Sequence, residues 1–160
     1  MPPGWLDEAI TRSAAAQLRT LIAVDQQRQP GPWAIKDPRS SLLLPLWKQV
    51  AEDLHIPLRI VLSVRDPAEV MVSLLQRDTI TAGMTAQRSQ HLWWHHNRSV
   101  LLEAGQLPLL VVSYSAWFKP RHCMRQLERL SDFCLGHPAT FTQLHAATAQ
   151  IQPSHRRSRR

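Results

Sequence analysis

Apolar residues recur at intervals of three and four along much of the chain, the spacing that places side chains on one face of a helix. Leu6, Ile10, Ala14 and Leu18 show this pattern near the amino terminus. The same spacing predicts amphipathic helices over 6–24, 41–54, 67–77, 84–104 and 120–135. Residues 79–85 contain Gly83 and are predicted as a loop.

Three short apolar runs, 33–35, 59–64 and 109–114, interrupt the helical pattern and predict strands. Short apolar strands that alternate with helices are typical of βαβ units, whose parallel sheet is covered by helices on both faces. The pattern therefore predicts a three-layer α/β fold with a partial parallel sheet. We expect one domain over residues 1–151 and a basic disordered tail over 152–160.

The charge of the chain is concentrated at its carboxyl terminus. The formal net charge is +7, but residues 155–160 read HRRSRR, and without their four arginines 15 basic residues face 12 acidic ones, a balance of +3. A basic tail can bind phosphates, so a nucleic-acid or polyanion-binding module is the alternative function. The tail is short, and we expect no stable nucleic-acid complex.

Other composition signals are weak. The two cysteines, Cys123 and Cys134, form no CxxC motif, and His91 and His95 share a helix face without a third ligand in sight, so we expect no metal site. The first ten residues show no basic, apolar secretory signal, and no apolar run reaches about 20 residues. A cytoplasmic protein without a transmembrane segment is the expectation.

The candidate chemistry lies at two predicted strand ends. Lys36-Asp37-Pro38-Arg39 follows the first run, and Arg65-Asp66-Pro67 follows the second. The carboxyl ends of parallel strands meet at one sheet edge, where open α/β sheets bind ligands, so Lys36, Arg39 and Arg65 are expected to converge on an anion. The alternative is that Asp37 and Asp66 pair with neighbouring arginines only to close the turns.

Four segments resemble a known family. IKDPRSSLLLPLW, VLSVRDPAEVMVSLLQRD, HLWWHHN and PLLVVSYSAW, in this order, look like the middle and late part of bacterial sulfotransferases that use 3′-phosphoadenosine 5′-phosphosulfate (PAPS). The resemblance covers roughly residues 30–136, and RDPxEVxxSLxxR is its most specific element. It implies a P-loop NTPase-like topology.

The resemblance also implies roles for individual residues. Arg65 and Ser73 correspond to the arginine and serine that hold the 3′-phosphate of PAPS or of adenosine 3′,5′-bisphosphate. Lys36 corresponds to the lysine that contacts the transferring sulfuryl group, and Asp37 is the candidate general base by position. Arg39 is a further candidate nucleotide contact because of its expected place at the same sheet edge. Tyr114 stands where the family has a Tyr-Glu-Asp run, although the two acids are replaced here.

One part of the family pattern has no counterpart in these residues. The family begins with a strand and an RSGTS-like loop that holds the 5′-phosphosulfate at a helix amino terminus. We therefore expect sulfuryl transfer from PAPS to the hydroxyl of a small molecule or glycan in the complete enzyme, and impaired transfer or none by this chain alone. A partner or self-association is expected to cover the exposed sheet edges.

Overall fold

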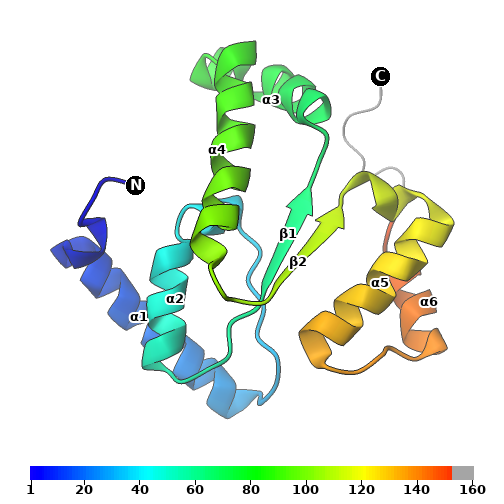
Figure 1. The fold of residues 1–160 in the computed structure, drawn as a ribbon, viewed down its shortest axis with the longest axis horizontal. Coiled ribbons are helices and arrows are strands. Elements are labelled where there is room, and N and C mark those ends of the chain that lie inside the picture. Colours follow the sequence, from blue (N-terminus) through cyan, green and yellow to red (C-terminus); the bar gives the residue numbers. More distant parts are fainter. Residues whose placement is uncertain (153–160) are drawn as a thin grey trace. The chain divides into compact units, whose positions relative to one another are not determined.

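The computed structural model describes residues 1–152, and the basic tail predicted for 152–160 lies outside this range from residue 153 onwards. The chain divides into two compact units (Figure 1). Of the described residues, the first unit consists of 1–60 and 99–108, and the second of 61–98 and 109–152. Each unit is described by itself.

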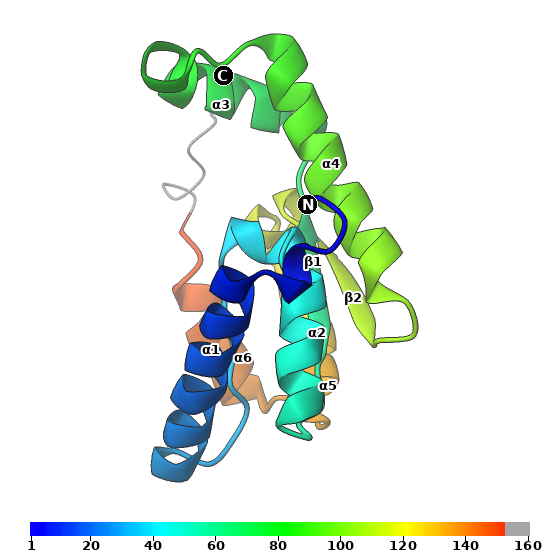
Figure 2. The same cartoon turned by 90° about the vertical axis from the view of Figure 1, so that its left-hand side faces the viewer.

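The first unit is helical. A short 3-10 helix, η1 (Trp5–Asp7), leads into α1 (Ala9–Arg28), and a second, η2 (Pro38–Ser41), leads into α2 (Leu44–Asp53). Helices α1 and α2 lie side by side (Figure 2). Their apolar faces meet in a core whose buried members are Ala15, Ile22, Leu46 and Val50. Both predicted helices are confirmed, but Ile10 of the predicted apolar face is 76% exposed.

Polar contacts at the margin of this core hold the first unit together. Arg19 of α1 pairs with Asp53 of α2 at 2.6 Å, and Lys48 Nζ donates to the carbonyl of Glu103 at 3.2 Å. Trp33 packs its ring 6.3 Å from that of Trp47. Partly buried apolar residues pack against the core itself; they are Trp5, Leu6, Leu18, Trp33, Trp47, Leu54 and Ile56.

The second unit contains the sheet. Its elements are β1 (Ile60–Val64, with Ile60 at the border of the first unit), α3 (Pro67–Ala82), most of α4 (Ala86–Ala104) and β2 (Leu109–Ser113). The 3-10 helix η3 (Ser115–Phe118) and the helices α5 (Pro120–Leu135) and α6 (Phe141–Ala149) follow. The predicted helix over 120–135 is confirmed at both ends, because Pro120 starts it and Gly136, with a φ of 77°, ends it.

Strands β1 and β2 form a two-stranded sheet. The amide of Ile60 donates to the carbonyl of Pro108, and at the other end the amide of Tyr114 donates to the carbonyl of Val64, so the strands run parallel. This register places Tyr114 beside the residue that follows β1, which is Arg65. The prediction of a mixed α/β chain with a parallel sheet is confirmed in this coarse form.

Two predictions about secondary structure are wrong. Residues 33–35 form no strand within the described chain, because Trp33 packs on Trp47 and donates its ring N–H to Asp25 at 3.3 Å instead of joining a ladder. The first part of the loop predicted for 79–85 is helical, because α3 continues as far as Ala82. The helix ends at Gly83, whose φ of 56° lies in the left-handed region. Helix α6 was not predicted at all; a capping box of Thr140 and Gln143 starts it.

Candidate functional site

The corner between β1 and α3 is built by three consecutive residues. Pro67 occupies the first turn of α3, and the Asp66 carboxylate caps the helix by accepting from the amides of Ala68 at 2.8 Å and Glu69 at 3.3 Å. The chain therefore leaves the sheet sharply after Val64. Asp66 thus closes the turn through backbone amides and not through a neighbouring arginine, and Arg65 is left at the carboxyl end of the strand.

The Arg65 side chain is held on two sides. Its Nε donates to Glu69 Oε2 at 3.1 Å, one helical turn away, and its guanidinium carbon lies 4.6 Å from the centre of the Tyr114 ring. The side chain is 18% exposed. The Nη2 atom is buried and has no hydrogen-bond partner among the described residues. A buried donor without a partner is costly, so this atom favours an acceptor that the protein does not itself provide.

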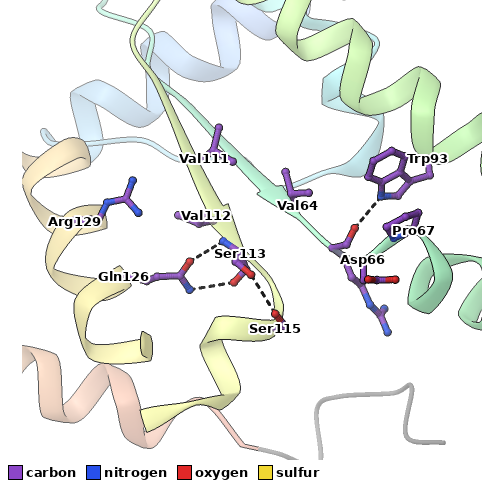
Figure 3. Close-up of a pocket in the computed structure, with 11 residues that line it drawn as sticks. Val64, Asp66, Pro67, Trp93, Val111, Val112, Ser113, Ser115, Gln126 and Arg129 are labelled. Atoms are coloured by element: carbon purple, nitrogen blue, oxygen red, sulfur yellow. Dashed lines mark hydrogen bonds between the residues drawn. The ribbon is translucent and has the colours of Figure 1, made fainter. Parts of the chain in front are cut away.

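The backbone of Arg65 is fixed as well. The Trp93 ring N–H donates to the Arg65 carbonyl at 2.9 Å (Figure 3), which ties the corner to α4. A polar ring N–H at a half-buried position needs such an acceptor. The guanidinium is therefore preorganised: its backbone, its Nε and its flat face all have fixed neighbours, and little order remains to be imposed when a ligand binds.

An open cavity of about 470 Å³ adjoins this corner and lies wholly within the second unit. Its size falls in the range of small-molecule sites. Two arginines and one carboxylate line it, and that carboxylate, Asp66, already caps α3. The full lining is Val64, Arg65, Asp66, Pro67, Trp93, Val111, Val112, Ser113, Ser115, Gln126 and Arg129. The charges available to a ligand are thus positive.

Gln126 of α5 forms the opposite wall with an unusual pair of hydrogen bonds (Figure 3). Its Oε1 accepts from the Ser113 amide at 2.6 Å, and its Nε2 donates to the Ser113 carbonyl at 3.1 Å. The side-chain amide thus pairs with β2 as a neighbouring strand would. It satisfies the last residue of the edge strand and fixes α5 against the sheet.

Ser73 and Tyr114 complete the set of predicted residues in this unit. Tyr114 lies against Arg65, as described, and its ring also packs edge-on to Phe118 at 5.3 Å. Ser73 is half-buried on α3, one turn beyond Glu69. Residues four apart share a helix face, so Ser73 lies on the same face of α3 as Glu69, which pairs with Arg65 just before the helix.

The remaining predicted residues belong to the first unit, and their geometry favours a turn. Asp37 accepts from the Arg39 amide at 2.8 Å and pairs with the Arg39 side chain at 2.7 Å, and so caps η2. The hydrogen bonds from Arg39, followed by the charges of Arg39 and Lys36, lower the pKa of Asp37 to about 2. A carboxylate of such low basicity is a poor general base near neutral pH. Lys36 is exposed beside it.

Sequence reasoning missed Glu69, Gln126 and Arg129 as parts of the site. One signal was available: Gln126 interrupts the apolar stripe of α5 that Cys123 and Leu130 define at intervals of three and four. A polar residue in a buried stripe needs a partner, but its partner, the backbone of Ser113, could not be read from the pattern. Arg129 gave no signal, because a surface arginine on an amphipathic helix is ordinary.

The histidine-rich segment of α4 brings no third potential metal ligand together with its histidines among the described residues. His95 and His96 have ring centres 6.4 Å apart, and no group of three or more potential ligands comes together anywhere in residues 1–152. Within the same residues, none of the helices has both the length and the apolar character needed to cross a bilayer.

Comparisons of the chain with protein-family models, with curated proteins and with solved structures found no match. The function proposed below therefore depends on the resemblance of the motifs and on the geometry of the Arg65 corner.

Proposed function

We propose that this chain binds the 3′-phosphate end of PAPS and of adenosine 3′,5′-bisphosphate, as part of a PAPS-dependent sulfotransferase. The observation that carries the proposal is the preorganised Arg65 guanidinium, whose buried Nη2 has no hydrogen-bond partner within residues 1–152. A guanidinium is suited to phosphate because it offers several N–H donors in one plane. Strands β1 and β2 would belong to a P-loop NTPase-like sheet.

Charge in the cavity supports an anionic ligand. Arg65 and Arg129 line the cavity, and the Asp66 carboxylate is occupied by two backbone amides of α3. Glu69 opposes this charge, since it pairs with Arg65 Nε. A phosphate would therefore bind beside an existing ion pair, and the negative charge of Glu69 would lower its affinity.

The reaction proposed for the complete enzyme is a displacement at sulfur. An acceptor hydroxyl oxygen forms a bond to sulfur, the bond from sulfur to the 5′-phosphate oxygen breaks, and the hydroxyl proton passes to a base. Adenosine 3′,5′-bisphosphate leaves with the electron pair. Lys36 is the proposed contact to the sulfuryl group, and catalysis of this kind depends on positioning and charge stabilisation.

Binding of adenosine 3′,5′-bisphosphate to the full chain, measured by titration calorimetry, tests the proposal. Arg65→Gln is expected to weaken binding about 10- to 100-fold, because a hydrogen bond to a charged group contributes about 1.5–3 kcal/mol. Ser73→Ala should weaken it about 3- to 10-fold. Arg77→Gln is the matched control, since Arg77 lies on α3, is 67% exposed and pairs with Asp78.

A variant that is expected to strengthen binding makes the test more specific. Glu69→Gln keeps an oxygen that can accept from Arg65 Nε but removes the negative charge, so anion binding should tighten about 3- to 10-fold. Equal affinities of wild type and Arg65→Gln, or equal losses in Arg65→Gln and Arg77→Gln, would overturn the proposal. Circular dichroism of each variant checks that the fold is intact.

A further inference from the structure

The net positive charge of the chain is concentrated in two segments, and the Arg65 corner belongs to neither of them. Residues 1–118 contain 11 basic and 10 acidic residues, so this part of the chain is almost neutral. Residues 119–132 and 155–160 together contain eight basic and two acidic residues, a balance of +6 out of the total of +7. Charge asymmetry of this kind is typical of a protein that binds a polyanion.

The first basic segment forms the outward face of α5. Arg121, Arg125 and Arg129 are exposed and recur at intervals of four residues, so they form a stripe along one side of the helix. Successive arginines are about 6 Å apart along the helix axis, because each residue advances it by about 1.5 Å. None of the three makes an ion pair within the described residues, although Glu128 and Asp132 lie on the same helix. Their donors are therefore available to another molecule.

The second basic segment begins beside the first. Helix α6 packs against α5 (Figure 1), and Ile151, just after α6, lines the same apolar groove as Trp117 and Phe118. Lys119 and the start of α5 follow Phe118 directly. The chain is thus brought back to the end of α5 at which the arginine stripe starts, and residues 155–160 begin four residues after Ile151. Because a chain spans at most about 3.5 Å per residue, the covalent connection keeps the tail arginines near this stripe.

The composition of the two segments favours a nucleic-acid backbone as the partner. Seven of their eight basic residues are arginines, whose planar guanidinium binds phosphate with two parallel hydrogen bonds. Duplex DNA carries one negative charge per about 1.7 Å, so several phosphates fit the stretch of about 12 Å between the first and last arginine of the stripe. A lipid surface fits less well, because the exposed residues of α5 between its two ends are all polar, whereas an interfacial helix inserts apolar side chains.

We propose that the stripe of Arg121, Arg125 and Arg129, together with the basic residues 155–160, binds the phosphate backbone of nucleic acid without reading its sequence. The tail is short for this task, and α5 supplies the further contacts on a rigid element. The inference goes beyond the proposed function and does not depend on it, because neither Arg121 nor Arg125 lines the cavity beside Arg65.

Binding of the full chain to a short labelled DNA duplex, followed by fluorescence anisotropy at several salt concentrations, tests this proposal. We expect a Kd of about 10⁻⁴–10⁻⁶ M near physiological salt and a linear fall of log K with log salt. The double variant Arg121→Gln/Arg125→Gln should make this slope less steep by about 1.8, since each phosphate contact contributes about 0.9. Deletion of residues 155–160 should reduce it by about 3.6 for the four arginines.

A matched control removes the same charge elsewhere. Arg12→Gln/Arg28→Gln changes two exposed arginines of α1 and should leave the slope unchanged. An unchanged slope in the α5 double variant, or an equal reduction in the α1 double variant, would overturn the proposal, because α5 would then have no specific part in binding.

Two further probes identify the partner. Binding of the wild type to phosphatidylserine vesicles but not to the duplex would assign the surface to a membrane, and equal affinity for poly-glutamate would reject nucleic acid as the specific partner. Arg65→Gln should bind the duplex as the wild type does. Loss of duplex binding in Arg65→Gln would place the nucleic acid in the cavity instead of on the stripe.

Discussion

The pairing of the Gln126 amide with the backbone of Ser113 gives the sharpest test of how the second unit is built. Gln126 is 6% exposed, and its amide both accepts and donates. Gln126→Glu keeps the shape and the acceptor but replaces the donor by a second oxygen. At neutral pH that oxygen faces the Ser113 carbonyl oxygen without a proton between them.

The size of the expected stability loss in Gln126→Glu follows from the lost hydrogen-bond donor. A buried polar group left without its partner costs about 1–3 kcal/mol, and the introduced carboxylate also loses hydration. We therefore expect Gln126→Glu to lower the free energy of unfolding by about 2 kcal/mol near pH 7. Gln126→Leu, which leaves both Ser113 groups unpaired, should cost a similar amount at every pH. Gln90→Glu adds the same charge at an exposed position of α4 and should stay within about 0.5 kcal/mol of wild type.

The pH dependence distinguishes a missing proton from general damage. Burial and the Ser113 carbonyl favour the protonated acid, so the pKa of the introduced carboxyl group should rise above its usual range in the folded state. A group with a raised folded pKa adds stability that is fully present below the unfolded pKa and is lost as the pH rises through the folded value. Gln126→Glu should therefore recover towards wild type near pH 4.

Urea unfolding followed by circular dichroism, near pH 7 and near pH 4, measures these differences. Each variant is compared with the wild type at the same pH, so that pH effects common to all chains cancel. If Gln126→Glu unfolds at the wild-type urea concentration near pH 7, or if its deficit is the same at both pH values, the donor role assigned to Gln126 is wrong.

Three further outcomes are expected. The Asp37 carboxyl carbon, followed by NMR, should titrate near pH 2, so its pairing with Arg39 is lost as the pH falls from about 4 to about 2. Arg39→Ala should return the midpoint of this titration towards 3.8. A midpoint near 3.8 in the wild type would contradict the pairing. Burial raises the pKa of the Cys123 thiol, so a thiol reagent should modify it rapidly only in denaturant, and fast modification of the native chain would show the site to be open. Val50→Ala should destabilise the first unit by about 2 kcal/mol in urea unfolding, against less than about 0.5 for the exposed Val24→Ala, and equal effects would place Val50 outside the core.

Helices were well predicted because their signals are local. The apolar spacing of α5, with Pro120 at its start and Gly136 after its end, is contained in a single segment and needs no other part of the chain. The end of α3 was placed too early, since a glycine ends a helix where it stands, and residues before Gly83 gave no reason for the helix to stop sooner. The prediction of a strand at 33–35 was wrong. A run of three apolar residues is found in loops that pack against a helix as well as in strands, and Trp33 packs against Trp47 of α2.

The Arg65 corner was predictable in part for the same reason. A short β-branched run followed by Arg65-Asp66-Pro67 indicates a strand, a turn and a helix start, and the structure places all three there. The position of Ser73 within α3 follows from the helical spacing of the residues after Pro67. By contrast, Asp37 and Arg39 share a turn whose chemistry is local, and the structure adds the bidentate pairing that closes this turn.

The sequence by itself determined the helices α1 to α5, the strands β1 and β2 and the arginine at the end of β1, because capping, helix spacing and strand runs act over a few neighbouring residues. Only the tertiary structure decided what surrounds that arginine: Tyr114 reaches it through the register of a parallel sheet, Trp93 through α4, and Gln126 and Arg129 line the same cavity from α5. These contacts join residues far apart in the chain, and no local pattern specifies which distant side chain fills a given side of a cavity.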